Sequence, residues 1–84
     1  MKPLKNQPYA KVLGEYLRMR RNQLHKSTSE VEEEAFIADK HLGRIERGEV
    51  EPYSSTLHKL IKVLHIDPRE LHQTIDEKMG WEND

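Results

Sequence analysis

Histidine is the residue type in this 84-residue chain that most readily suggests metal binding. His58, His65 and His72 recur every seven residues, so a continuous helix would bring them toward one flank. However, Asp67 and Pro68 are typical of a new helix start, which separates His72 from the other two. We therefore expect no metal site and no cofactor. The five histidines of the chain are His25, His41, His58, His65 and His72.

Catalysis by a nucleophile is not indicated either. Ser54, Ser55 and Thr56 are consecutive hydroxyl residues, but they are typical of a helix start, and no nucleophile with a suitable base beside it stands out. The chain has no glycine-rich phosphate loop, and its length suits one small domain without a large cleft. It also has no cysteine, which excludes disulfides and thiolate zinc sites. We do not expect an enzyme.

Charge is unevenly distributed along the chain, although the net charge is only −1. Residues 1–26 contain seven basic residues and one acidic residue, whereas residues 27–39 contain five acidic residues and no basic one. Proteins that bind nucleic acid usually have an overall basic excess, so any DNA binding here has to come from a local basic surface. No apolar run is long enough to cross a membrane, and no signal peptide follows Met1. A cytoplasmic protein is expected.

Apolar residues at helical spacing predict five short helices and an all-α fold, and no strand-like alternation is present. We expect a mobile basic arm over residues 1–8, one domain over residues 9–75 and an acidic tail over residues 76–84. The first helix is predicted to begin at Tyr9 or Ala10.

Capping residues divide the rest of the pattern into helices. Ser27 with Glu30 three residues later forms a capping box, which predicts a helix starting at Thr28. The next helix is predicted over residues 39–47, with Gly48 after it in a left-handed conformation.

Two further helices are expected in the second half. Ser54 or Ser55 is predicted to cap the fourth helix, which carries a leucine-rich stripe. Asp67 and Pro68 predict the start of a fifth helix, which we expect to fray after Ile75.

The block Arg44-Ile45-Glu46-Arg47-Gly48, followed by Pro52 and the leucine-rich helix, is the most specific motif in the chain. The segment from Leu13 to Leu71 resembles the helix-turn-helix domain of the Cro and C1 phage repressors, the XRE family. The resemblance implies a five-helix, phage-repressor-like fold with the helix-turn-helix at the second and third helices. The matching residues are Leu13-Gly14-Glu15, Arg21, Ser27, Val31, Ile37, Leu42, Arg44 to Gly48, Pro52, Thr56-Leu57, Leu60, Leu64 and Leu71.

The resemblance also implies which residues contact DNA. The third helix would enter a major groove, where arginine and lysine suit the edge of guanine. Arg21 and Glu46 match a structural ion pair of the family. The base-reading positions would be Asp39, Lys40, His41 and Arg44. The backbone contacts would come from Thr28, Arg47, and Lys2 and Lys5 of the arm.

The turn between the second and third helices departs from the family pattern. Glu32 stands where the family usually has a small alanine. Phe36 replaces the usual glycine, and because a left-handed phenylalanine is costly, we expect a turn of another geometry. Ala38 replaces a capping serine or threonine, so we expect Asp39 to cap the third helix instead.

These observations leave more than one function open. We expect a transcriptional regulator, a repressor, that binds double-stranded DNA as a homodimer. The alternative is a protein-interaction module on the same fold, such as an anti-repressor, an antitoxin-like partner or an accessory factor. It is favoured by the acidic residues over 30–39 and by Glu49 and Glu51, which oppose phosphate binding. A third possibility is the DNA-binding part of a longer regulator. Trp81 could pack back on the domain, anchor a dimer or partner contact, or belong to a mobile end.

Overall fold

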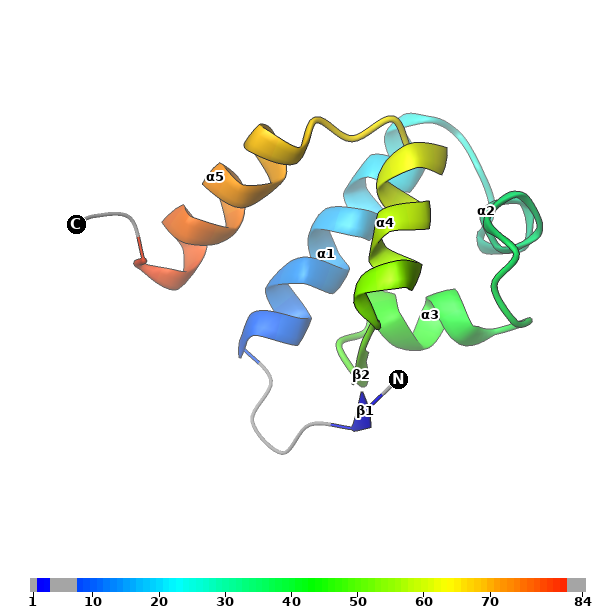
Figure 1. Ribbon diagram of the computed structural model, residues 1–84, viewed down its shortest axis with the longest axis horizontal. Helices are drawn as coiled ribbons and strands as arrows, with labels where there is room; N and C mark the ends of the chain where they lie inside the picture. The colour runs from blue at the N-terminus through cyan, green and yellow to red at the C-terminus, as the bar shows by residue number, and fades with distance from the viewer. Residues whose placement is uncertain (1, 4–7, 82–84) are drawn as a thin grey trace.

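Five helices make up most of the structure, a computed structural model that describes residues 2–3 and 8–81 (Figure 1). This confirms the predicted all-α fold class. In chain order the helices are α1 (Pro8–Gln23), α2 (Thr28–Ala35), α3 (His41–Glu46), α4 (Ser54–Val63) and α5 (Pro68–Met79). Helices α2 and α3 lie at one end of the molecule and α5 at the other, with α1 and α4 between them (Figure 1).

A short antiparallel pair of strands joins the N-terminal segment to the loop after α3. Strand β1 (Lys2–Pro3) pairs with β2 (Val50–Glu51). The expectation of no strands is therefore wrong. Each strand has only two residues, too few for an alternating pattern to be visible in the sequence. Lys5 lies outside the described residues.

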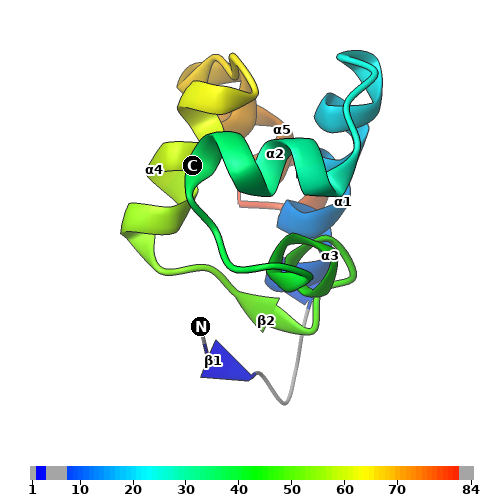
Figure 2. The ribbon, with the colours of Figure 1, turned by 90° about the vertical axis from the view of Figure 1, so that its right-hand side faces the viewer.

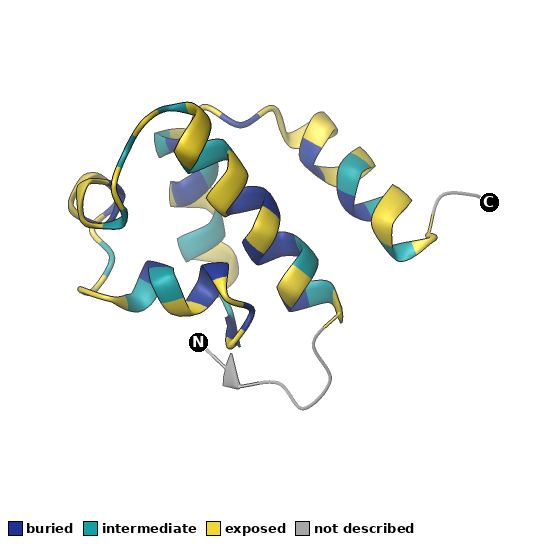
Figure 3. Cartoon of the chain, turned by 180° about the vertical axis from the view of Figure 1, so that it is seen from behind, coloured by how far each residue is buried: buried dark blue, intermediate teal, exposed yellow. Residues whose placement is uncertain are grey.

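The hydrophobic core contains buried side chains from all five helices, and buried and exposed residues alternate along the helices (Figure 3). Helix α1 packs against α3 and α5, and α2 packs against α3 and α4. The largest fully buried side chains are Leu13, Leu17, Val31, Leu42, Ile45, Leu60 and Leu64. The apolar spacing in the sequence placed these residues on inward faces because burial of aliphatic side chains is the main force that brings the helices together.

Several predicted helix ends are confirmed. The Ser27 hydroxyl accepts a hydrogen bond from the Glu30 amide at 3.0 Å, and the Glu30 carboxylate accepts one from the Ser27 amide at 2.7 Å. Asp67 accepts from the amide of Arg69 at 2.9 Å, with Pro68 as the first residue of α5. Gly48 has the left-handed backbone expected of it, with φ of 74°.

Two predicted ends in the second half are wrong. Neither Ser54 nor Ser55 caps α4, because both lie inside the helix and Tyr53 precedes it without a side-chain cap. Helix α5 does not fray after Ile75 but continues to Met79. Its end is held by aromatic stacking: the rings of Trp81 and Tyr9 lie 5.9 Å apart at an interplanar angle of 15°.

The turn between α2 and α3 has a left-handed residue at Phe36, which was not expected from the sequence. Phe36 ends α2 with φ of 56° and ψ of 48°, and its amide donates to the carbonyls of Glu32 and Glu33. The prediction of another geometry at Phe36 is wrong. The ring is 88 % exposed, so it avoids steric conflict with the domain but contributes little to the core.

Helix α3 begins later than expected. It starts at His41, preceded by Lys40 in a left-handed conformation with φ of 68°, so Asp39 neither caps nor begins it. The cap comes instead from α2. A carboxylate oxygen of Glu32, which is 4 % exposed, accepts a hydrogen bond of 2.9 Å from the buried amide of Leu42. This bond satisfies a first-turn amide that has no partner within its own helix.

Replacing Phe36 with glycine is expected to stabilise the domain. Glycine adopts the left-handed conformation without steric cost, whereas other residues pay about 1–2 kcal/mol there, partly offset by the larger entropy of unfolded glycine. We predict that Phe36→Gly raises the free energy of unfolding by about 0.5–1 kcal/mol in urea denaturation. Phe36→Ala is the matched control, since alanine removes the ring but keeps the Cβ atom. Equal effects of the two substitutions would rule out backbone strain as the cause.

Replacing Glu32 with alanine is expected to destabilise the domain. The substitution leaves the buried Leu42 amide without a partner, which costs about 1–3 kcal/mol. Glu32→Gln keeps an acceptor oxygen and should lose less. Thermal and urea unfolding of the two variants measure the difference. A Glu32→Ala variant as stable as the native chain would show that the carboxylate does not cap α3.

Candidate nucleic-acid interface

Helix α3 is placed by a close backbone contact with α1. Gly14 faces the end of α3, and a Cβ atom at this position would lie 2.3 Å from the carbonyl oxygen of Ile45 and 2.6 Å from that of Glu46. Any side chain here would therefore push the two helices apart. Glycine lets the backbone of α1 serve as the surface on which the last turn of α3 rests.

An ion pair fixes the same contact from the side. Two nitrogens of the Arg21 guanidinium donate to the Glu46 carboxylate, at 2.7 and 2.9 Å, and the third donates to the carbonyl of Lys26 at 2.8 Å. The side chains are only 12 % and 5 % exposed. The hydrogen bond with Glu46 raises the pKa of Arg21 against the opposing effect of burial. A two-point contact of this kind fixes orientation as well as distance.

A basic pocket opens beside this ion pair. It has a volume of about 510 Å³ and is formed by α1, the start of α2 and the region of α3. Figure 2 views the molecule from the side on which α2 and α3 lie. Three of the residues around the pocket are exposed and basic, namely Arg18, Lys40 and Arg47. Thr28 adds the amide end of α2, which carries partial positive charge.

The structure brings some of the predicted contact residues together and separates others. Lys40, Thr28 and Arg47 meet at the basic pocket. His41 and Arg44 lie within α3 itself, the first half-buried and the second exposed. Asp39 lies elsewhere, in an acidic hollow also lined by Ser29, Glu32, Glu33 and Ile37.

Of the two arm residues in the predicted interface, the structure describes Lys2. Lys2 is placed through its backbone, in β1 beside β2, and β2 in turn contacts α3. The N-terminal segment therefore starts near the end of the third helix. Lys5 lies outside the part of the chain that the structure describes.

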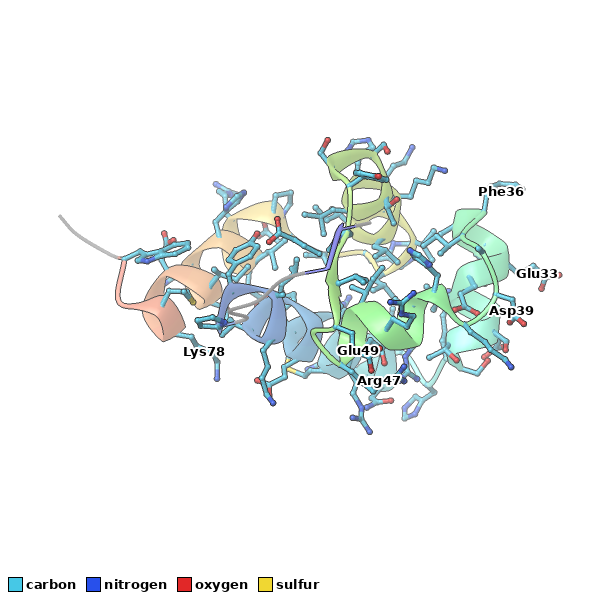
Figure 4. The ribbon with its side chains drawn as sticks, turned by 90° about the horizontal axis from the view of Figure 1, so that it is seen from below. Glu33, Phe36, Asp39, Arg47, Glu49 and Lys78 are labelled. Carbon is cyan, nitrogen blue, oxygen red and sulfur yellow. The ribbon has the colours of Figure 1, made fainter. Side chains whose placement is uncertain are left out.

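Two arginines of the interface share one carboxylate. Glu49 contacts the Nε atom of Arg47 at 2.5 Å and the Nε atom of Arg44 at 3.5 Å. Figure 4 shows Arg47 and Glu49 next to each other on the side of α3. The hydrogen bond from Arg47 lowers the pKa of Glu49, and the same bond raises the pKa of Arg47. This contact was not predicted from the sequence, where Glu49 counted only as a negative charge opposing phosphate binding.

Arg18 is a further candidate that sequence analysis missed. It lines the basic pocket, has an exposed side chain and makes no ion pair with the described residues. The sequence contained a signal for this position. Arg18 lies three residues before Arg21, residues three apart share a helix face, and Arg21 was already expected to pair with Glu46. Arg20 has another role, since it donates to the carbonyls of Leu64 and His65 at 2.8 and 3.1 Å.

Within residues 2–3 and 8–81, no group of three or more histidine, cysteine or acidic side chains is arranged to hold a metal ion. None of the helices in this part of the chain combines the length and apolar character needed to cross a membrane.

Comparison with known families places the geometry in context. The family described as "Helix-turn-helix domain" matches residues 12–73, from the second turn of α1 to the middle of α5. The match includes the contact between α1 and α3, the turn and the basic pocket. A comparison with curated proteins found no match. The family match confirms the resemblance to XRE-type domains, and the chain belongs to the helix-turn-helix domain family.

Proposed function

We propose that this protein is a cytoplasmic, sequence-specific transcriptional regulator that represses by binding double-stranded DNA as a homodimer. A helix-turn-helix domain suggests DNA binding. The observation that carries the proposal is the basic pocket beside α3, where three exposed basic side chains meet the amide end of α2. DNA binding requires positive charge near the phosphates. The overall charge of −1 does not provide it, but this local basic surface does.

In the proposed complex, the pocket holds a phosphate of the DNA backbone. Arg18, Lys40 and Arg47 supply the charge, and Thr28 supplies backbone amide dipoles directed at the anion. Gly43 also lines the pocket and carries no side chain that would keep the DNA at a distance. Lys2 and Lys5 would extend these contacts along the backbone from the N-terminal segment.

Base reading would come from the outer surface of α3 and the residue before it. Arg44 can donate two hydrogen bonds to guanine, and Lys40 and His41 lie at the end of α3 that would enter the groove first. We leave Asp39 out of this proposal because it lines the acidic hollow rather than the basic pocket.

The proposed dimer follows from the size of the reading element. Helix α3 has only six residues, so one copy can read few base pairs. Two copies related by two-fold symmetry would place two such helices in successive major grooves of a pseudo-palindromic operator.

Substitution of Arg44 tests the base-reading role. Loss of a two-point contact with guanine should cost about 1–3 kcal/mol at the preferred site and relax the preference at one position. Selection of bound sequences from a random duplex pool, first with the native chain and then with Arg44→Ala, measures both effects. An unchanged consensus and affinity would exclude Arg44 as a reader.

Substitution of Arg18 tests the phosphate pocket. Arg18→Ala should weaken binding about equally on all sequences and reduce the slope of log K against log salt by about one. Asn22→Ala is the control, because Asn22 is exposed one turn further along α1 and does not line the basic pocket. A loss confined to the preferred site, or an equal loss in both variants, would contradict a phosphate contact at Arg18.

A second function, a protein-interaction module, is favoured by one observation. Phe36 is a strained and 88 % exposed aromatic residue, and Glu33 and Asp39 lie near it at the same end of the molecule (Figure 4). Exposed aromatic residues are frequent anchors of protein contacts. Titration with random duplex DNA separates the two functions, because steep salt dependence supports DNA binding and the absence of binding at low salt supports the interaction module.

A further inference from the structure

We propose that Glu49 increases the selectivity of this domain for its target by holding Arg44 and Arg47 together and opposing their use on phosphates. The inference rests on the proposed DNA-binding function and assigns a specificity-determining residue to the same surface. Glu49 would be a positioning residue, because it acts on DNA through two arginines.

The place of Glu49 is set by the backbone at the end of α3. The amide of Gly48 donates to the carbonyl of Ile45 and the amide of Glu49 donates to the carbonyl of Arg44, both at 3.0 Å. With Gly48 in a left-handed conformation, these two bonds form a Schellman motif. Glu49 is therefore anchored to the end of α3, which contains Arg44 and is followed by Arg47, and its carboxylate lies within reach of both arginines.

The contacts use one particular nitrogen of each arginine. Glu49 approaches Arg47 and Arg44 at their Nε atoms, at 2.5 and 3.5 Å. Within the described chain, the terminal nitrogens of these two arginines donate no hydrogen bond. All three side chains are exposed, at 51 % for Arg44, 59 % for Arg47 and 46 % for Glu49. The donors at the tips of both arginines are thus available to DNA while Glu49 remains in place.

The carboxylate penalises phosphate binding in two ways. It lowers the combined charge of the three side chains from two positive to one, which weakens the charge-dependent part of the affinity for any duplex. A phosphate oxygen that binds the tip of either arginine also brings a negative charge close to the carboxylate, and the two charges repel each other. Both penalties apply to every DNA sequence.

Base reading is penalised less. Guanine offers neutral acceptors, O6 and N7, which the terminal nitrogens can reach without displacing Glu49 from Nε. The carboxylate also limits the orientations available to two flexible side chains, so less conformational entropy is lost when they engage a base. Arg47 would hold a phosphate in both kinds of complex, so its penalty cancels in the ratio of the two affinities. Arg44 would contact a phosphate in non-specific binding but guanine at the target site, so the penalty on Arg44 falls mainly on non-specific binding and the ratio of specific to non-specific affinity increases.

Glu51 provides a matched control. It is an acidic residue two positions further along the same segment, in β2, and it makes no ion pair with the described arginines. Glu49→Gln and Glu51→Gln change the net charge equally, so a general charge effect would appear in both variants. Only Glu49→Gln would release the arginines.

The experiment measures the affinity of the native chain and both variants for a random duplex and for the duplex selected by the native chain, over a range of salt concentrations. We expect Glu49→Gln to bind the random duplex about three- to tenfold more tightly at low salt, with a slope of log K against log salt steeper by up to about one. Its ratio of selected-site to random-duplex affinity should fall by several-fold. Glu51→Gln should change each quantity by less than half as much, and the thermal midpoints of all three proteins should agree closely because the ion pairs are exposed.

The possible failures are distinguishable. Equal effects of Glu49→Gln and Glu51→Gln, or an unchanged affinity ratio in Glu49→Gln, would overturn the role of Glu49 while leaving the proposed function intact. A native chain that binds neither random nor selected duplex at low salt would overturn the proposed function and, with it, the inference.

Discussion

The contact between α1 and α3 is the constraint on which the rest of this structure depends. Gly14 allows the backbones to approach within a distance that no side chain would permit, and Arg21 and Glu46 lock the angle through two short hydrogen bonds. The positions of the side chains on the outer surface of α3 are set by this contact. The basic pocket exists because Arg18, on the same helix as Gly14, is thereby brought beside Lys40 and Arg47.

Acidic residues have two opposite uses around the third helix. Glu32 and Glu46 are buried and act on structure: the first binds the amide of Leu42 and the second binds Arg21. Glu49 is exposed and contacts side chains that the proposed function directs at DNA. Carboxylates near a DNA-binding surface are therefore not all opposed to binding. Their effect depends on whether they are buried in the fold, as Glu32 and Glu46 are, or exposed beside the arginines, as Glu49 is.

Features set by local chemistry could be predicted from the sequence, and features set by tertiary contacts could not. The capping box at Ser27 and the left-handed Gly48 were correct because each depends on a few neighbouring residues. The predicted conformation of Phe36 was wrong, because the packing of α2 and α3 on either side of this residue outweighs the intrinsic cost of a left-handed backbone. The hydrogen bond from the Leu42 amide to Glu32 and the contacts of Glu49 depend on where the two glutamate side chains point, which no periodicity reveals. For the candidate site, the residue types could be read from the sequence, whereas their grouping came from the structure, which places Asp39 and Lys40 in different pockets.

The central claim is that α3 and the basic pocket form a DNA-binding surface. The most direct test is to follow the amide chemical shifts by NMR while a random-sequence duplex is added at low salt. The largest changes should occur at Thr28, at Gly43 and Arg44 in α3, and at Arg18 on α1, and they should diminish as salt is added. Changes centred on Phe36 and Glu33, or no changes at any salt concentration, would contradict the claim and favour a protein-interaction role for this domain.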